Sequence, residues 1–337
     1  MKPSPITPTV DLDAREGVQH GFLRLPYSRD DSAWGAIMIP ITVIAHGEGP
    51  TALLIGGNHG DEYEGPVALA QLANGLLADE VQGRVIILPY MNYPAFRAGT
   101  RTSPIDKGNL NRLFPGRPDG GVTEKIADYV FRELVARADY VLDIHAGGKT
   151  LNFVPFAAVH VLDDAEQQAR CVAAMQAFNA PYSMLMLEQD NVGMLDTVVE
   201  AEGKVFVTTE LGGGGAVTAH SAGVAKRGVR GFLAHAGILN EAPPQATSMM
   251  LDMPDANCFV TAWHDGLVDW HVDLGEPVSV GQVLATVLDI QRTGSPGVEY
   301  RALRDGVLVA RHFPGLINGG DTLAVVGNVL DAPANSA

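Results

Sequence analysis

The chain has 337 residues, of which 46% are hydrophobic and 18% charged, and its formal net charge is −16 at pH 7. This length allows a large apolar core and a second, smaller domain. The acidic balance argues against nucleic-acid binding, which needs basic surface patches. A negative net charge can also attract a cationic substrate. Because net charge acts mainly on solubility, we favour the interpretation that the acidic residues keep the surface soluble.

The sequence contains no apolar run of the roughly 18 residues that a membrane helix needs. Residues 1–5 lack an apolar signal core, so we expect the protein in the cytoplasm. The two cysteines, Cys171 and Cys258, lie far apart in the sequence. In that compartment we expect them to be isolated thiols.

The first 245 residues are predicted to form an α/β domain. Residues 1–30 are polar, and we expect them to be irregular. Apolar strands and helical patterns then alternate, which predicts a layered, mixed sheet with helices on both faces. The predicted helices span 66–79, 122–137 and 164–179, and the predicted strands lie near 37–43, 52–55, 84–89, 140–144, 156–162 and 204–209.

The remaining chain has a different pattern. Pro243 and Pro244 interrupt the alternation, and short strands with turns follow from 255 to 330, which predicts a smaller, all-β domain. Residues 274–282 are typical of the turn in a biotinyl or lipoyl carrier domain of the barrel-sandwich type. Such carriers modify a lysine, and no lysine follows Lys226, so we predict that this domain is not a carrier.

The most informative stretch is the glycine-rich turn at residues 56–65. It follows the apolar run 52–55 and precedes a helix that has Pro66 in its first turn. His59 and Glu62 therefore lie at the carboxyl end of a strand. There, the pair can place an imidazole nitrogen and a carboxylate on one small cation, and zinc accepts both ligand types.

Two further strands end in the same way, in His145 and in Glu210, each followed by glycines. In open α/β sheets, ligands bind outside the carboxyl ends of the strands. The sequence therefore predicts a zinc site made of His59, Glu62 and His145, with Glu210 left over as a base. Asp143, two residues before His145, is either a hydrogen-bond partner of the site or simply a buried or edge carboxylate.

These residues, with the segments 99–101 and 109–116, resemble the succinylglutamate desuccinylase/aspartoacylase family of zinc deacylases over most of residues 20–330. The resemblance implies a zinc-carboxypeptidase-like fold, one Zn²⁺ per chain, and a C-terminal β domain (255–330) that caps the active site. The implied roles are zinc binding by His59, Glu62 and His145, carbonyl polarisation by Arg101, binding of the substrate carboxylate by Asn111 and Arg112, and general base catalysis by Glu210.

The resemblance also implies that the partner is a small N-acyl amino acid, and it leaves open whether the chain forms a homo-oligomer. One position departs from the family. Aspartoacylases commonly have Asp-Leu-Asn-Arg where this chain has Asn109, Leu110, Asn111 and Arg112. A negative charge near the carboxylate clamp is therefore missing, so the substrate need not be N-acetylaspartate.

Within the family, the chain most resembles the branch that deacetylates Nα-acetyl-L-2,4-diaminobutyrate in ectoine breakdown. Glu188, Asp190 and Asp196 lie before the Glu210 strand, and one of them could pair with the side-chain ammonium of that substrate, although each alone is more often a solvated charge. The alternatives are a deacylase for another N-acyl amino acid, a zinc carboxypeptidase, and a non-catalytic binding module. The complete set of predicted site residues argues against the last.

Overall fold

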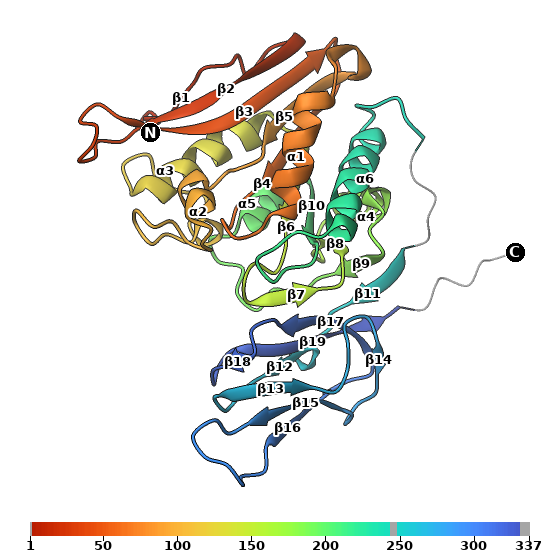
Figure 1. Cartoon of the computed structure of the whole chain (residues 1–337). Helices are drawn as coiled ribbons and strands as arrows, with labels where there is room; N and C mark the ends of the chain where they lie inside the picture. Colours follow the sequence, from red (N-terminus) through yellow and green to blue (C-terminus); the bar gives the residue numbers. More distant parts are fainter. Residues whose placement is uncertain (1, 243–247, 331–337) are drawn as a thin grey trace, which may run out of the picture.

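The computed structural model describes residues 2–242 and 248–330, which form a larger α/β part and a smaller C-terminal β part (Figure 1). The strands of the α/β part are β1 (Thr7–Pro8), β2 (Glu16–Pro26), β3 (Ala36–His46), β4 (Thr51–Gly56), β5 (Gly83–Leu88), β6 (Tyr140–His145), β7 (Leu151–Phe153), β8 (Phe156–Val159), β9 (Tyr182–Leu185), β10 (Val205–Glu210) and β11 (Met249–Asp252). Its helices are α1 (Glu64–Gly75), α2 (Tyr93–Ala98), α3 (Val122–Tyr129), α4 (Ala165–Phe178), α5 (Leu195–Ala201) and α6 (Ala219–His235).

The central sheet is mixed, as predicted. Its strands follow the order β1-β2-β3-β5-β4-β6-β10-β8-β9-β11. The neighbours β5, β4, β6 and β10 are parallel, and so are β8, β9 and β11. In the antiparallel sense, β2 pairs with β3, β3 with β5, and β10 with β8. Parallel strands need connections that cross a face of the sheet, and helices supply them here.

Helices cover both faces of the sheet because its central strands are apolar on both sides (Figure 1). In β4, Leu54 packs into the core beneath α1, α4 and α6, whereas Leu53 and Ile55 pack into the core beneath α3 and α5. Successive side chains of a strand point to opposite faces, so one continuous apolar run supplies both cores.

Residues 1–30 are not irregular, and our expectation for them was wrong. β2 pairs with β3 along its full length, from Glu16 opposite His46 to Pro26 opposite Ala36. Leu23 and Leu25 are buried, while residues between and before them are exposed or half-buried. Buried and exposed residues alternate clearly only in the last part of this strand. The rest is polar, so the sequence pattern did not indicate a strand.

The C-terminal part contains β12 (Phe259–Thr261), β13 (Gly266–Trp270), β14 (Pro277–Val278), β15 (Val283–Leu288), β16 (Val298–Arg301), β17 (Gly306–His312), β18 (Leu316–Ile317) and β19 (Thr322–Val329). β16, β15, β13 and β18 form an antiparallel sheet, and β19, β17 and β14 continue the central sheet beyond β11. Buried aliphatic side chains such as Leu284, Leu308 and Leu323 fill the core between these strands.

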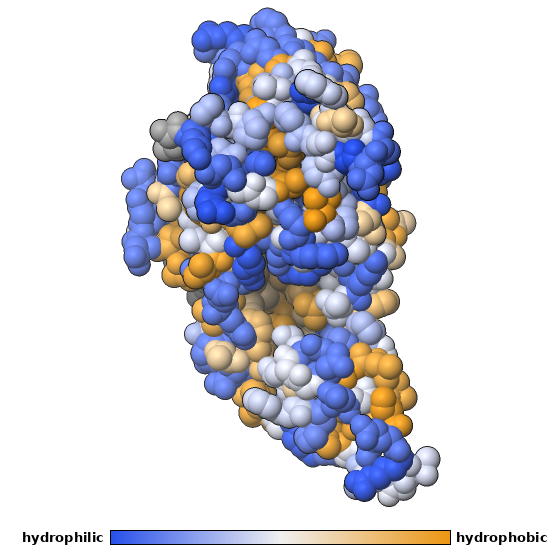
Figure 2. Space-filling model, turned by 90° about the vertical axis from the view of Figure 1, so that its left-hand side faces the viewer, coloured by the Kyte–Doolittle hydropathy of each residue, from blue (hydrophilic) through white to orange (hydrophobic). Residues whose placement is uncertain are grey.

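The two parts are joined through main-chain pairing. β11 pairs with β9 and β19, and β17 pairs with β7 through Ala310 opposite Phe153. The predicted boundary near residue 245, with Pro243 and Pro244, lies outside the described residues. Figure 2 shows a mostly hydrophilic face that is hollowed between the two parts.

Two smaller expectations concern the whole chain. Cys171 and Cys258 are both free and buried, as expected. Among residues 2–242 and 248–330, no helix combines the length and the apolar character that a membrane crossing requires.

Candidate active site

The predicted zinc ligands and Glu210 come together because their strands are parallel neighbours. β4, β6 and β10 lie side by side, and Glu210 is directly opposite His145 in the pairing of β10 with β6. The carboxyl ends of parallel neighbours meet at one edge of the sheet. Side chains in the turns beyond this edge can therefore face a ligand. The turns after these strands therefore open towards one point.

Glycines make this close convergence possible. A Cβ atom on Gly60 would lie 2.0 Å from the carbonyl carbon of Ala95, so the turn that carries His59 packs directly against α2. After Glu210, the four residues Gly212–Gly215 all have positive φ. Side-chain-bearing residues rarely adopt this conformation, so the loop depends on glycine at each position.

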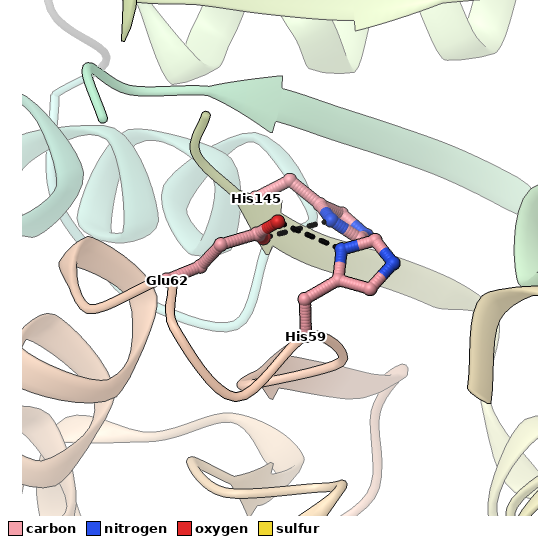
Figure 3. A group of neighbouring side chains, drawn as sticks. All are labelled: His59, Glu62 and His145. Atoms are coloured by element: carbon pink, nitrogen blue, oxygen red, sulfur yellow. Dashed lines mark hydrogen bonds and ion pairs between the residues drawn. The ribbon is translucent and has the colours of Figure 1, made fainter. Parts of the chain in front are cut away.

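The carboxylate of Glu62 points toward both imidazoles, as Figure 3 shows. Its Oε1 is 2.7 Å from Nδ1 of His59, and its Oε2 is 3.0 Å from Nδ1 of His145. All three residues are buried, and one donor atom from each lies within 4.8 Å of the others. Three nitrogen and oxygen donors that converge in this way form the kind of set that catalytic zinc prefers.

The outer nitrogens of both imidazoles face acceptor oxygens. Nε2 of His145 is 2.8 Å from Oδ2 of Asp143, which also accepts a hydrogen bond from the Asn58 amide at 2.9 Å. Nε2 of His59 is 3.2 Å from Oδ1 of Asn109. When Nε2 of each ring donates its proton to the neighbouring oxygen, Nδ1 carries a lone pair that points towards Glu62. A histidine that binds a metal needs such a free lone pair.

These contacts settle two points that the sequence left open. Asp143 is a hydrogen-bond partner of the site through His145, not merely a buried carboxylate. Asn109, where aspartoacylases commonly have aspartate, contacts His59. The departure thus bears directly on a predicted metal ligand: a neutral amide polarises the His59 ring less than a carboxylate would.

Electrostatics also favour a cation among these three residues. Burial lowers the pKa of His59, so its ring is neutral and can donate a lone pair. Burial acts to lower the pKa of His145 too, but the charges of Asp143 and Glu62 raise it well above its usual value. Burial would raise the pKa of Glu62, yet the two histidines hold it well below its usual range. The negative charges of Asp143 and Glu62 thus favour a proton on His145. A metal ion bound there would compensate for the same two carboxylates.

Glu210 has the features of a proton acceptor that awaits a partner. Its Oε2 is buried and has no hydrogen-bond partner among the described residues. Burial, together with the charge of Glu62, raises the pKa of Glu210 well above its usual value. A raised pKa allows a carboxylate in a cavity to hold a proton that it has accepted and to return it later.

Arg101, Asn111 and Arg112 line the same cavity, and the roles that the resemblance implies for them stay predictions. Nη1 of Arg101 is 3.7 Å from Oε1 of Glu62, and this side chain is half-exposed. Oδ1 of Asn111 accepts a hydrogen bond from the backbone of Leu195 at 3.0 Å, and Nη1 of Arg112 donates to the carbonyl of Asn111 at 2.7 Å. Donor groups of all three remain for a ligand in the cavity.

The cavity also contains two of the three acidic residues that the sequence offered as alternatives, and others that the sequence analysis did not name. Glu188 and Asp196 line it, together with Met186, Met194 and Thr208, whereas Asp190 is exposed and does not. Leu151 and Phe153 of β7 form another part of its wall, and β7 pairs with β17 of the C-terminal part. No residue beyond Glu210 is among the described lining residues, and the idea that the C-terminal domain caps the site stays a prediction.

Comparisons with known proteins give the same family that the sequence motifs resemble. The succinylglutamate desuccinylase/aspartoacylase catalytic domain matches residues 48–236. A curated relative, the N-alpha-acetyl-L-2,4-diaminobutyric acid deacetylase of Halomonas elongata, is 58% identical over 334 residues, which cover 98% of this chain and 97% of the relative.

Solved structures show the same similarity. A product-bound structure of the ectoine utilization protein EutE (DoeB) from Ruegeria pomeroyi has a TM-score of 0.96 and 61% identity, with 97% of this chain and 100% of that one covered. A succinylglutamate desuccinylase from Silicibacter sp. TM1040 has a TM-score of 0.95 and 62% identity, with 98% and 100% covered.

Proposed function

The chain belongs to the succinylglutamate desuccinylase/aspartoacylase family, and we propose that it is the member that converts Nα-acetyl-L-2,4-diaminobutyrate to diaminobutyrate and acetate in ectoine breakdown. The similarity to the Halomonas elongata deacetylase over nearly the whole of both chains carries this assignment. The EutE structure, which is named for ectoine utilization, supports the same metabolic context.

The cofactor that fits the site is a single zinc ion bound by His59, Glu62 and His145. The support is the converging, buried donor set, together with the hydrogen-bond acceptors that turn both Nδ1 atoms inward. When bound, zinc supplies Lewis-acid chemistry and lowers the pKa of water towards neutrality. Three protein residues that would hold the ion match the ligand number that catalytic zinc sites use.

Glu210 is the proposed general base and acid of the reaction. It accepts a proton from water as the water oxygen adds to the acetyl carbonyl carbon. It then delivers this proton to the amide nitrogen as the carbon–nitrogen bond breaks, so that acetate and the free amine leave. Its raised pKa and its unpartnered Oε2 suit both transfers.

The arginines have separate roles in this proposal. Arg101, which already lies near Glu62, donates to the carbonyl oxygen as negative charge develops on it. Arg112 and Asn111 bind the α-carboxylate of the substrate, because a guanidinium offers two parallel donors that match a carboxylate. The carboxylate thereby fixes the distance from the clamp to the scissile amide.

A substrate comparison tests the proposal. Zinc-loaded protein should hydrolyse Nα-acetyl-L-2,4-diaminobutyrate with a higher kcat/KM than N-acetylaspartate, N-succinylglutamate or a blocked dipeptide. A preference for one of the other two acylated amino acids would assign the chain to another branch of the family. A preference for the dipeptide would indicate a carboxypeptidase.

A further inference from the structure

A second group of titratable side chains lies beside the proposed catalytic centre. We call Glu188, Asp196 and His160 the acidic corner. Glu188 lies in the loop after β9, Asp196 is the second residue of α5, and His160 directly follows β8. One donor atom from each lies within 4.8 Å of the others, and both carboxylates line the cavity that holds Arg112 and Glu210.

No cationic side chain among the described residues forms a hydrogen bond or an ion pair with the carboxylates of the acidic corner, although His160 and Arg112 act on Glu188 through their charges. Asp196 is only 4% exposed. Its Oδ1 accepts hydrogen bonds from the backbone and hydroxyl of Thr197, but its Oδ2 has no hydrogen-bond partner among the described residues. Glu188 has no hydrogen bond or ion pair within the same residues, and burial, with the charge of Asp196, raises its pKa above the usual value. A buried charge without a partner is costly, so both carboxylates favour an incoming cation.

His160 compensates for these charges only in part, because it is paired with Glu200 and forms no hydrogen bond or ion pair with Glu188 or Asp196 within the described residues. Its Nδ1 lies 3.0 Å from Glu200, while its Nε2 is buried without a partner. Burial would lower the pKa of His160, but the contact with Glu200, together with the charges of Asp196 and Glu188, raises it to about 9. A protonated imidazole has no lone pair for a metal ion, so an organic cation fits this corner better than a second metal.

The same cavity holds a positive group that is also unpaired. Arg112 donates to the carbonyl of Asn111 and forms no ion pair within the part of the chain that the structure describes. It therefore does not neutralise Glu188 or Asp196, although its charge acts on Glu188 from a distance. A cavity with separate, unsatisfied charges of both signs suits a ligand that carries a carboxylate and an ammonium group.

We propose that Glu188 and Asp196 bind the side-chain ammonium of the substrate, and that this contact determines which acylated amino acid is accepted. This inference rests on the proposed function and extends it to the residues that select the side chain. Arg112 serves any N-acyl amino acid. The acidic corner attracts a cationic side chain, tolerates a neutral one poorly, and repels the side-chain carboxylate of N-acetylaspartate.

The test compares Asp196→Asn and Glu188→Gln with the wild-type enzyme on two substrates of similar shape. These are Nα-acetyl-L-2,4-diaminobutyrate and Nα-acetyl-L-norvaline, in which a methyl group replaces the ammonium. Each variant should lower kcat/KM for the first substrate by about 100-fold, because a buried charge loses its partner. For norvaline the change should stay within about threefold, since no charge is involved.

Two further measurements make the result specific. Asp190→Asn removes an exposed acid from the same loop and should leave both rates unchanged. Calorimetry with free L-2,4-diaminobutyrate should show weaker binding to both corner variants but not to Asp190→Asn. Thermal unfolding of each variant checks that a lost rate does not reflect a lost fold.

The possible outcomes separate this inference from the proposed function. If the wild type prefers acetylated diaminobutyrate and both corner variants keep that preference, the inference is wrong and the function stands. If the wild type prefers N-acetylaspartate, the proposed function itself fails. If metal analysis finds a second metal ion per chain that disappears in Asp196→Asn, the acidic corner is a metal site, and the inference is overturned.

Discussion

The turns after β4, β6 and β10 bury many polar side chains, whereas the C-terminal β part buries mainly apolar ones. In and around these turns, the buried polar residues are Asn58, His59, Asp61, Glu62, Glu64, Asp143 and His145. Within the described residues 256–329, His312 alone is a buried polar residue, and its Nε2 donates to the carbonyl of Leu316 at 2.9 Å.

The hydrogen bonds differ in the same way. One buried oxygen each of Asn58, Asp61, Asp143 and Glu210 has no hydrogen-bond partner among residues 2–242 and 248–330. In the described C-terminal part, Nε of Arg304 is the corresponding case. Unpartnered buried groups cost stability, so a chain retains them where a ligand completes them. The contrast teaches that one region is built to bind, at a cost in stability, and the other to hold the fold together.

The largest expected effect is the loss of the metal centre in His145→Ala. Removing one of the three proposed ligands should weaken zinc binding by about three orders of magnitude or more and abolish turnover. Metal analysis after dialysis, with His46→Ala as a control at a half-exposed histidine, measures this directly. A variant that keeps one zinc per chain would remove His145 from the ligand set.

Glu210→Gln should separate catalysis from stability. Turnover should fall by about 10²–10⁴-fold, because general acid–base catalysis contributes that much. Zinc content should be unchanged. The melting temperature should not fall, since the substitution removes a buried carboxylate that lies near the charge of Glu62. A normal kcat in zinc-loaded protein would exclude Glu210 as the base.

Leu323→Ala probes the other region. Leu323 is fully buried in the apolar core of the C-terminal part, so its truncation should lower the free energy of unfolding by about 2–5 kcal/mol. Zinc content and kcat/KM should stay close to those of the wild type below the unfolding transition. Leu316→Ala, at a position that is 57% exposed, is the matched control. A large loss of activity in folded Leu323→Ala would show that this core also shapes the cavity.

The smallest effect concerns the pair of His160 and Glu200 and depends on pH. The pKa of His160 is raised to about 9 in the folded protein, above about 6.5 in the unfolded chain. The pair therefore stabilises the fold fully below pH 6.5, and this contribution, about 3 kcal/mol at most, is lost as the pH rises through 9. Denaturant unfolding of wild type and Glu200→Gln should show a stability gap that narrows between these pH values. A gap that does not change with pH would show that His160 is not charged in the folded protein.

Local sequence signals determined much of the candidate site. Apolar runs that end in glycine-rich turns placed His59, His145 and Glu210 at strand ends, and the predicted helices 66–79 and 164–179 correspond to α1 and α4. These features depend on residues that are close in the sequence, such as the spacing of His59 and Glu62 or proline in the first turn of a helix.

Other helices and strands were not predicted, or were predicted with the wrong extent, because their apolar patterns are weak. β2 is largely polar, and α6, which we did not predict, carries several glycines between its apolar positions. The predicted helix 122–137 is divided into α3, a π-helical segment (Val130–Leu134) and a short 3₁₀ turn (Val135–Arg137). Packing against the sheet stabilises such elements where their local preference is small.

The sequence by itself determined which residues could bind a metal and move a proton, because these roles depend on side-chain chemistry and on strand ends. Only the tertiary structure decided their partners: Asn109 on His59, Asp143 on His145, and Glu188 beside Asp196 rather than the exposed Asp190. These contacts join residues from separate loops. Their distances depend on the order and direction of strands in the sheet, which no local pattern encodes.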